Sequence, residues 1–136
     1  MKITEIMSRD IEKIDGQISV RQAAEHMAAR DIGGILVESA GVIMGVITER
    51  DLLKKVVAKG LDPEKTKAEE IMTLPLITVT ADYTVDDVIY LMSTLKIRRV
   101  VVEEEGKAVG VVSARDIIQS KLSEMPKYSE LEKAQV

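Results

Sequence analysis

Apolar side chains recur at helical spacing in two stretches of the chain, residues 20–27 and 85–92. This periodicity predicts an amphipathic helix in each stretch. Ser19 and Thr84 stand directly before them, each followed three residues later by Gln or Asp, which is the pattern of a helix N-cap. We therefore expect the two helices to begin at these residues.

Runs rich in β-branched residues follow each predicted helix and are interrupted by short turns that contain glycine. Such runs predict two β-hairpins, with strands at 35–38, 42–47, 100–103 and 108–112. A short extended stretch precedes each first helix, at 11–14 and 76–79, and a second helix is expected at 49–58 and 114–123. The order β-α-β-β-α therefore occurs twice.

The same order recurs because the chain contains an internal repeat. A shift of 65 residues aligns 5–56 with 70–121 without a gap, with 13 identities in 52 positions. We divide the chain into a first repeat (1–58), a linker (59–68), a second repeat (69–123) and a polar, helical tail (124–136). Because each repeat is short for an independent domain, the two are expected to share one core.

Composition excludes several functions. The chain has no Cys and one His, His26, so disulfides, thiolate zinc sites and multi-histidine metal sites are excluded. A net charge of −4 and 2% aromatic residues disfavour nucleic-acid binding. No apolar run reaches the length of a membrane span, and no signal peptide opens the chain. We expect a cytoplasmic protein that is not an enzyme.

Two strings at predicted strand-to-helix junctions carry the candidate chemistry. Thr48 is followed by Asp51 after two residues, and Ser113 by Asp116. One interpretation is purely structural: the hydroxyl caps the helix and the carboxylate favours its positive end. The other is that the hydroxyl binds a ribose or phosphate oxygen while the carboxylate accepts from two ribose hydroxyls. The two roles are compatible.

The strings Gly-Val-Ile-Thr-Glu-Arg-Asp at 45–51 and Gly-Val-Val-Ser-Ala-Arg-Asp at 110–116 resemble the signature of cystathionine β-synthase (CBS) domains. The tripeptide Glu-Ile-Met, at 5–7 and 70–72, resembles the opening of that family. The resemblance implies an α/β (α+β) fold of two repeats related by a pseudo-twofold axis. It also implies clefts between the repeats that bind AMP, ADP, ATP or S-adenosylmethionine, and a regulatory role.

The resemblance places a first candidate site where Thr48 and Asp51 meet a pair of arginines from the second repeat. The guanidinium groups of Arg98 and Arg99 suit phosphate oxygens, although a solvated basic corner is the alternative. The full set is Val46, Thr48, Arg50, Asp51, Ile77, Ile97, Arg98 and Arg99.

A second candidate site would have glycines where the first has arginines, because Gly33 and Gly34 align with Arg98 and Arg99. We expect this site to be weaker or empty, or to suit an uncharged nucleoside or a thioether ligand. A plain turn is the alternative for the two glycines. The set is Glu12, Ile32, Gly33, Gly34, Val111, Ser113, Arg115 and Asp116.

These observations favour a regulatory protein that senses an adenosine-containing ligand and signals to a partner that the sequence does not name. No cofactor is required, although a bound nucleotide could carry Mg²⁺. A homodimer is expected, because the amphipathic helices leave faces that a second copy would cover. The alternatives are a structural dimerisation module without a ligand, and an accessory to a nucleotide-metabolism enzyme such as inosine monophosphate dehydrogenase.

Overall fold

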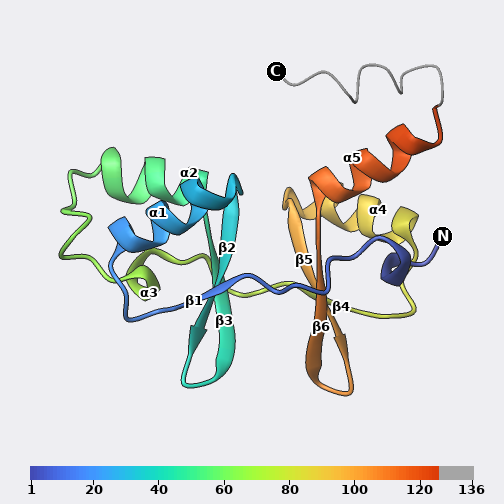
Figure 1. Cartoon of the computed structure of the whole chain (residues 1–136), viewed down its shortest axis with the longest axis horizontal. Helices are drawn as coiled ribbons and strands as arrows, with labels where there is room; N and C mark the ends of the chain where they lie inside the picture. The colour runs from blue at the N-terminus through green and yellow to red at the C-terminus, as the bar shows by residue number, and fades with distance from the viewer. Residues whose placement is uncertain (126–136) are drawn as a thin grey trace. The chain divides into compact units, whose positions relative to one another are not determined.

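The computed structural model describes residues 1–125 and divides into two compact units (Figure 1). Unit 1 comprises Met1–Ile11 and the chain from Ile77 onward, and unit 2 comprises Glu12–Leu76. The predicted helical tail, 124–136, lies outside the described residues except for its first two positions. The two sequence repeats and the two compact units therefore do not coincide. Residues 1–11, which open the first repeat, belong to the unit that contains most of the second repeat, and the residues that open the second repeat belong to the unit that contains most of the first.

Unit 2 contains a three-stranded sheet in the order β1-β2-β3, with β1 parallel to β2 and β2 antiparallel to β3. Its elements are β1 (Lys13–Asp15), α1 (Val20–Arg30), β2 (Gly34–Ser39), β3 (Val42–Thr48), α2 (Glu49–Asp51), the π-helix η2 (Leu52–Val57) and α3 (Ala68–Ile71). Unit 1 repeats this topology in the sheet β4-β5-β6. Its elements are the 3₁₀ turn η1 (Ile3–Glu5), β4 (Thr78–Thr80), α4 (Val85–Leu95), β5 (Arg99–Glu104), β6 (Lys107–Ser113) and α5 (Ala114–Ser123).

The predicted order β-α-β-β-α and the mixed α+β class are confirmed in both repeats. The first strand of each repeat begins two residues later than expected, at Lys13 and Thr78. The helix expected at 49–58 is wound differently from its counterpart α5, because it passes into a π-helix in which Ala58 N donates to Leu53 O at 2.9 Å. Such i→i+5 winding is rare and often lies at functional positions.

The opening segment of each repeat pairs with the last strand of the unit that it joins. Thr73 forms an antiparallel bridge with Val46 of β3, and Ser8 forms the equivalent bridge with Val111 of β6. A glycine precedes each paired valine. A Cβ atom on Gly45 would lie 2.6 Å from Thr73 O, so this close crossing requires glycine.

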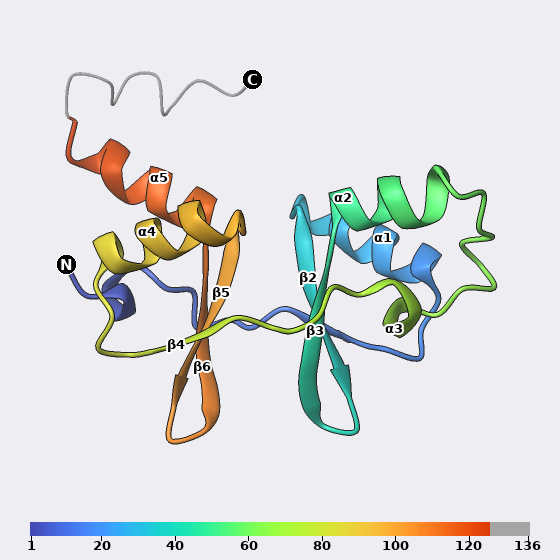
Figure 2. The ribbon, with the colours of Figure 1, turned by 180° about the vertical axis from the view of Figure 1, so that it is seen from behind.

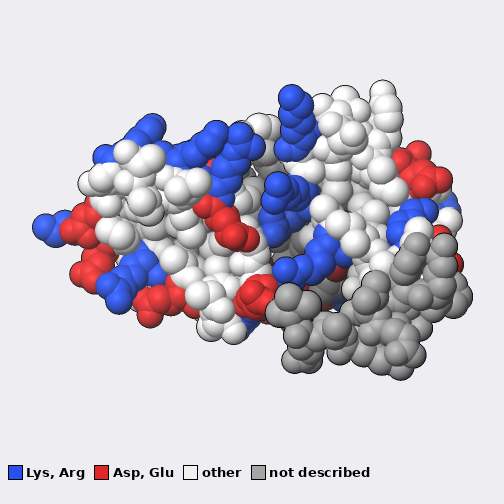
Figure 3. All heavy atoms as spheres, turned by 90° about the horizontal axis from the view of Figure 1, so that it is seen from above, with Lys and Arg blue, Asp and Glu red and all other residues white. Residues whose placement is uncertain are grey.

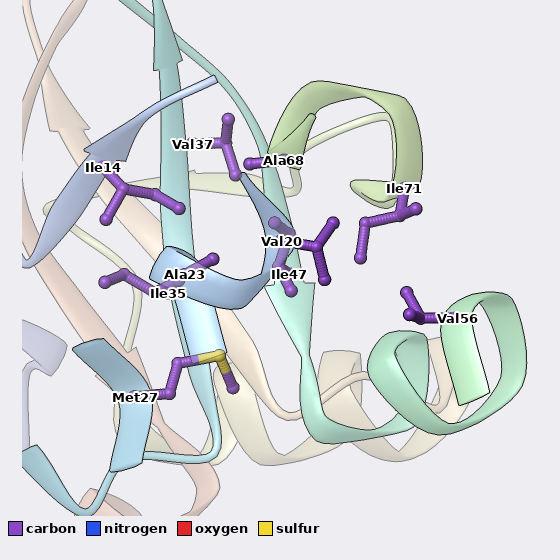
Figure 4. Close-up of a cluster of buried hydrophobic side chains, with 10 residues drawn as sticks. All are labelled: Ile14, Val20, Ala23, Met27, Ile35, Val37, Ile47, Val56, Ala68 and Ile71. Carbon is purple, nitrogen blue, oxygen red and sulfur yellow. The ribbon is translucent and has the colours of Figure 1, made fainter. Parts of the chain in front are cut away.

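Buried side chains form two hydrophobic clusters, one in each unit, so the expectation of one shared core is wrong. In unit 2 the apolar face of α1 packs on the sheet and on α3, as Figure 4 shows, through Ile14, Val20, Ala23, Met27, Ile35, Val37, Ile47, Val56, Ala68 and Ile71. In unit 1 the opening segment contributes Ile3, which is fully buried, to the equivalent cluster. Each unit therefore has a core of its own. That core combines most of one repeat with the opening segment of the other repeat.

Both hairpins turn through two residues with positive φ, and Figure 2 shows the hairpins from behind. The φ angles are 50° at Ala40 and 80° at Gly41, and 50° at Glu105 and 77° at Gly106. A two-residue loop with both φ angles positive is the type I′ turn that matches the twist of the strands.

Replacing Glu105 by asparagine should stabilise unit 1 by about 0.5–1 kcal/mol, because asparagine tolerates the left-handed conformation better than glutamate does. Urea unfolding of Glu105→Asn beside Glu104→Asn checks this expectation. Glu104 lies in β5 and lacks a positive φ, so its substitution should not stabilise. Equal effects of the two substitutions would contradict the argument.

Candidate functional site

Thr48 and Asp51 form a reciprocal cap where β3 ends and α2 begins. The Thr48 hydroxyl accepts a hydrogen bond from Asp51 N at 3.2 Å, and Thr48 N donates to Asp51 Oδ2 at 2.9 Å. The predicted capping role of both side chains is therefore confirmed. A strand that ends in threonine and is followed three residues later by aspartate can satisfy two otherwise unpaired backbone N–H groups in this way.

Asp51 has further partners that are not among the predicted site residues. Its Oδ1 atom accepts a hydrogen bond from Thr73 Oγ1 at 2.8 Å and forms an ion pair with Lys55 Nζ at 3.0 Å. The same ammonium group donates to the carbonyl oxygen of Ile71 at 3.0 Å. We refer to Asp51, Lys55 and Thr73 as the Asp51 clasp, because these residues tie the helix to the segment that follows α3.

Asp51 is the one buried charged residue within residues 1–125, with 6% of its surface exposed. Burial alone would raise the pKa of the Asp51 carboxyl group. The hydrogen bond from Thr48 N–H, the hydrogen bonds from Lys55 and Thr73, and the positive charge of Lys55 outweigh this effect, so the pKa lies below 3.8. Asp51 is therefore ionised at neutral pH, with its charge compensated inside unit 2.

Ser113 and Asp116 form the corresponding cap where β6 meets α5. Asp116 N donates to Ser113 Oγ at 3.1 Å, and Ser113 N donates to Asp116 Oδ2 at 2.8 Å. Asp116 is only half-buried. Among the residues that the structure describes, no donor bonds its other oxygen, Oδ1. The two caps are alike in their backbone contacts but differ in the surroundings of the carboxylate.

The residues of each candidate site divide between the two units. Unit 2 holds Val46, Thr48, Arg50 and Asp51 of the first site, and unit 1 holds Ile77, Ile97, Arg98 and Arg99. For the second site, unit 2 holds Glu12, Ile32, Gly33 and Gly34, and unit 1 holds Val111, Ser113, Arg115 and Asp116. The structure brings together the threonine or serine with its aspartate inside each unit, and the assembly of the full sites stays a prediction.

The backbone between the first helix and the second strand has the same contact in both units. The carbonyl oxygen of Gly33 accepts from Glu49 N at 3.0 Å, and that of Arg98 accepts from Ala114 N at 2.8 Å. This contact fixes the start of the second helix beside the glycine pair in unit 2 and beside the arginine pair in unit 1. Glu12, from the second candidate set, forms an ion pair with Arg30.

Sequence reasoning missed Lys55 and Thr73. Lys55 carries a weak signal, because a lysine four residues after an aspartate on one helix predicts an ion pair. Thr73 carries none, because it lies 22 residues from Asp51 in sequence and reaches it only through the pairing of residue 73 with β3.

Within residues 1–125 no three His, Asp or Glu side chains gather closely enough to hold a metal ion. No helix in that part of the chain is long and apolar enough to cross a membrane. Figure 3 shows that acidic and basic side chains both occur on the displayed face of unit 2.

Comparison with known proteins identifies the family. The family model described as "CBS domain" matches the chain twice, over residues 3–58 and 68–123. The two matches cover most of the sequence and contain both caps and both opening segments. The chain therefore belongs to the CBS-domain family, as the resemblance of the two strings implied.

The chain resembles an uncharacterised protein of Methanopyrus kandleri, with 35% identity over 121 residues that cover 88% of this chain and 62% of that protein. The chain thus spans less than two thirds of that relative. A solved CBS-domain protein from Burkholderia ambifaria superposes with a TM-score of 0.88 at 29% identity, covering 92% of this chain and 96% of its own. A hexameric CBS-CP12 protein from bloom-forming cyanobacteria gives a TM-score of 0.79 at 31% identity, covering 93% and 75%. CBS-pair proteins of this kind are generally regulatory, and none of these three has an enzyme name.

Proposed function

We propose that this CBS-pair protein binds an adenosine-containing ligand, such as AMP, ADP, ATP or S-adenosylmethionine, and passes its occupancy to a partner protein. The observation that carries the proposal is the duplicated cap in a member of the CBS family. Each cap places a hydroxyl and a carboxylate at the start of a helix. The hydroxyl there can bond a ribose or phosphate oxygen, and a carboxylate with an unfilled acceptor position can accept from a ribose hydroxyl. The likeness to the Methanopyrus kandleri and Burkholderia ambifaria proteins extends over both repeats, since it covers 88% and 92% of this chain.

The arginine pair supports a phosphorylated ligand for the site that contains Thr48. Arg98 is exposed and Arg99 half-buried at the start of β5. A guanidinium group keeps its charge at all physiological pH values and binds two phosphate oxygens at once. No residue of the glycine pair at 33–34 can do this, so the proposal keeps the expected difference in phosphate preference between the sites. A Mg²⁺ ion, if one is needed, would arrive with the nucleotide.

Thermal unfolding with AMP, ADP, ATP, NAD, adenosine and S-adenosylmethionine tests the proposal. A ligand at about 100 times its Kd should stabilise the folded state by about 2.7 kcal/mol, which raises the Tm by several degrees. Arg99→Gln should weaken the binding of AMP by at least about tenfold and leave the affinity for adenosine nearly unchanged, because only AMP carries a phosphate group. Glu104→Gln, a charge change in the same strand, is the control. Equal losses for AMP and adenosine would contradict the role of Arg99.

A second candidate function is a structural dimerisation module that binds no ligand. Exposed apolar side chains on α4 and α5 favour self-association; Tyr90 and Ile118 are 73% and 65% exposed. The cyanobacterial relative is hexameric, which agrees with self-association in this family. No thermal shift with any ligand of the panel would exclude the sensor and leave this module, and light scattering would then measure its oligomeric state.

A further inference from the structure

The Asp51 carboxylate has no remaining capacity to accept hydrogen bonds. On Oδ2 it receives Thr48 N at 2.9 Å and Thr48 Oγ1 at 3.2 Å. On Oδ1 it receives Thr73 Oγ1 at 2.8 Å and Lys55 Nζ at 3.0 Å. A carboxylate offers about four lone-pair positions, two on each oxygen. A ribose with two adjacent hydroxyl groups needs acceptor positions that Asp51 therefore lacks.

The second repeat has no equivalent of the clasp. The shift of 65 residues that aligns the repeats places Ser120 at the position of Lys55 and Ser8 at that of Thr73. Neither serine bonds Asp116. Ser120 Oγ lies 3.7 Å from Met1 Sδ, and Ser8 Oγ donates to the carbonyl oxygen of Asp10 at 3.3 Å.

Asp116 consequently keeps the capacity that Asp51 has lost. Among residues 1–125 its carboxylate receives Ser113 N on Oδ2, and no donor reaches Oδ1. Asp51 is buried, whereas Asp116 is half-buried. Both caps have the same backbone contacts, so the difference comes from the side chains that reach each carboxylate; Lys55 lies in the π-helix η2, and Ser120 lies in the α-helix α5.

We propose that Lys55 and Thr73 are specificity-determining residues. Because they occupy the Asp51 carboxylate, the two units of this protein differ in how they bind the hydroxyl groups of a ribose. While the clasp is closed, Asp51 holds the helix start in place and does not accept the hydroxyl pair of the ligand. Asp116 accepts it. This inference rests on the proposed function, because it concerns how the same ligand class is recognised. The sequence led us to expect the second site to be weaker or empty, or to suit an uncharged nucleoside or a thioether ligand; the inference makes it the site that binds the ribose hydroxyl pair and leaves the phosphate preference of the arginine pair unchanged.

The discrimination between adenosine and 2′-deoxyadenosine tests the inference, because neither ligand carries the phosphate that the arginine pair would favour at the site of Asp51. Both Kd values are measured by calorimetry well below the Tm of each variant. In the otherwise unchanged protein, Asp116→Asn should abolish most of the preference for adenosine. Asp51→Asn should leave the preference nearly unchanged, although it lowers stability. In the Asp116→Asn protein, Thr73→Val or Lys55→Met should restore a preference of at least about tenfold, because each frees a position on Asp51 Oδ1.

Two controls separate specificity from simple loss of structure. Lys55→Arg keeps a cation beside Asp51 and should leave the preference low in the Asp116→Asn protein. Ser120→Ala changes the aligned position of the second repeat and should have no effect. Thr73→Val removes an uncharged partner, so it decides the matter if Lys55→Met does not fold.

The outcomes distinguish this inference from the proposed function. If adenosine binds and its preference over 2′-deoxyadenosine is lost in Asp51→Asn but kept in Asp116→Asn, the inference is wrong and the proposed function stands. The same conclusion follows if neither Thr73→Val nor Lys55→Met changes the preference. If adenosine does not bind the unchanged protein although another ligand of the panel does, the inference is wrong and the proposed function stands. If no ligand of the panel binds, the proposed function fails and the inference fails with it.

Discussion

Replacing Gly45 by alanine should lower the free energy of unfolding by about 3 kcal/mol, near the upper end of the usual cost of overpacking. The added Cβ atom would lie 2.6 Å from the carbonyl oxygen of Thr73 and 3.0 Å from Leu74 Cδ2. Relief requires the backbone at 73 to move away from β3, which breaks the bridge between Thr73 and Val46. Thermal unfolding should show a decrease of roughly 10 °C in Tm for a chain of this size.

The aligned glycine of the second repeat provides a matched control. A Cβ atom on Gly110 would first meet Sδ of the Met7 side chain and would lie 3.0 Å from the carbonyl oxygen of Ser8. A methionine side chain can change rotamer at little cost. Gly110→Ala should therefore destabilise clearly less than Gly45→Ala, and the reverse order would show that the opening segments do not set the need for glycine.

The helices and hairpins could be predicted from the sequence because their signals are local. A hydroxyl at Ser19 or Thr84, followed three residues later by a side-chain acceptor, marks each N-cap, and the structure has both capping boxes. The turns were equally visible, since Gly41 and Gly106 adopt the positive φ that a two-residue loop needs. Local chemistry thus determines most of each β-α-β-β-α unit.

The opening segments could not be placed in this way. Residues 3–5 and 68–71 form single short turns, too brief for a periodic pattern, and their partners lie far away in sequence. Ile3 N donates to the carbonyl oxygen of Tyr83 across 80 residues, and no local rule predicts such a contact. The expectation of one shared core failed for this reason: the second repeat completes its core with the opening segment of the first, and the first with that of the second.

In the candidate site, too, the local contacts could be predicted from the sequence and the distant ones could not. Thr48 and Asp51 are three residues apart, so their contact follows from helix geometry. The saturation of Asp51 does not, because Thr73 reaches it from a different element. The π winding of η2 is likewise hidden, since residues 52–57 are ordinary helix formers and α5, in the aligned position, is a regular α-helix.

Asp51→Asn should lower the free energy of unfolding at pH 7 by about 2–3 kcal/mol, in the range expected for hydrogen bonds to a buried charge. Asparagine keeps the shape of the side chain but loses the charge that faces Lys55 and presents an NH₂ group to one of the donors. Asp116→Asn is the control. Its carboxylate is half-buried and has no cation within the described chain, so its substitution should cost less than that of Asp51.

The difference in unfolding free energy between wild type and Asp51→Asn should depend on pH if it comes from the charge of Asp51. The pKa of Asp51 is lower in the folded protein than its ordinary value of 3.8, so the unfolded chain takes up the proton first as the pH falls. The stabilisation is therefore complete well above pH 3.8 and is lost as the pH falls through the folded pKa. Urea unfolding of wild type and Asp51→Asn at a series of pH values should show the gap between them narrowing in acid. A gap that stays constant down to the acid limit of folding would mean that Asp51 stabilises unit 2 by packing and not by its charge.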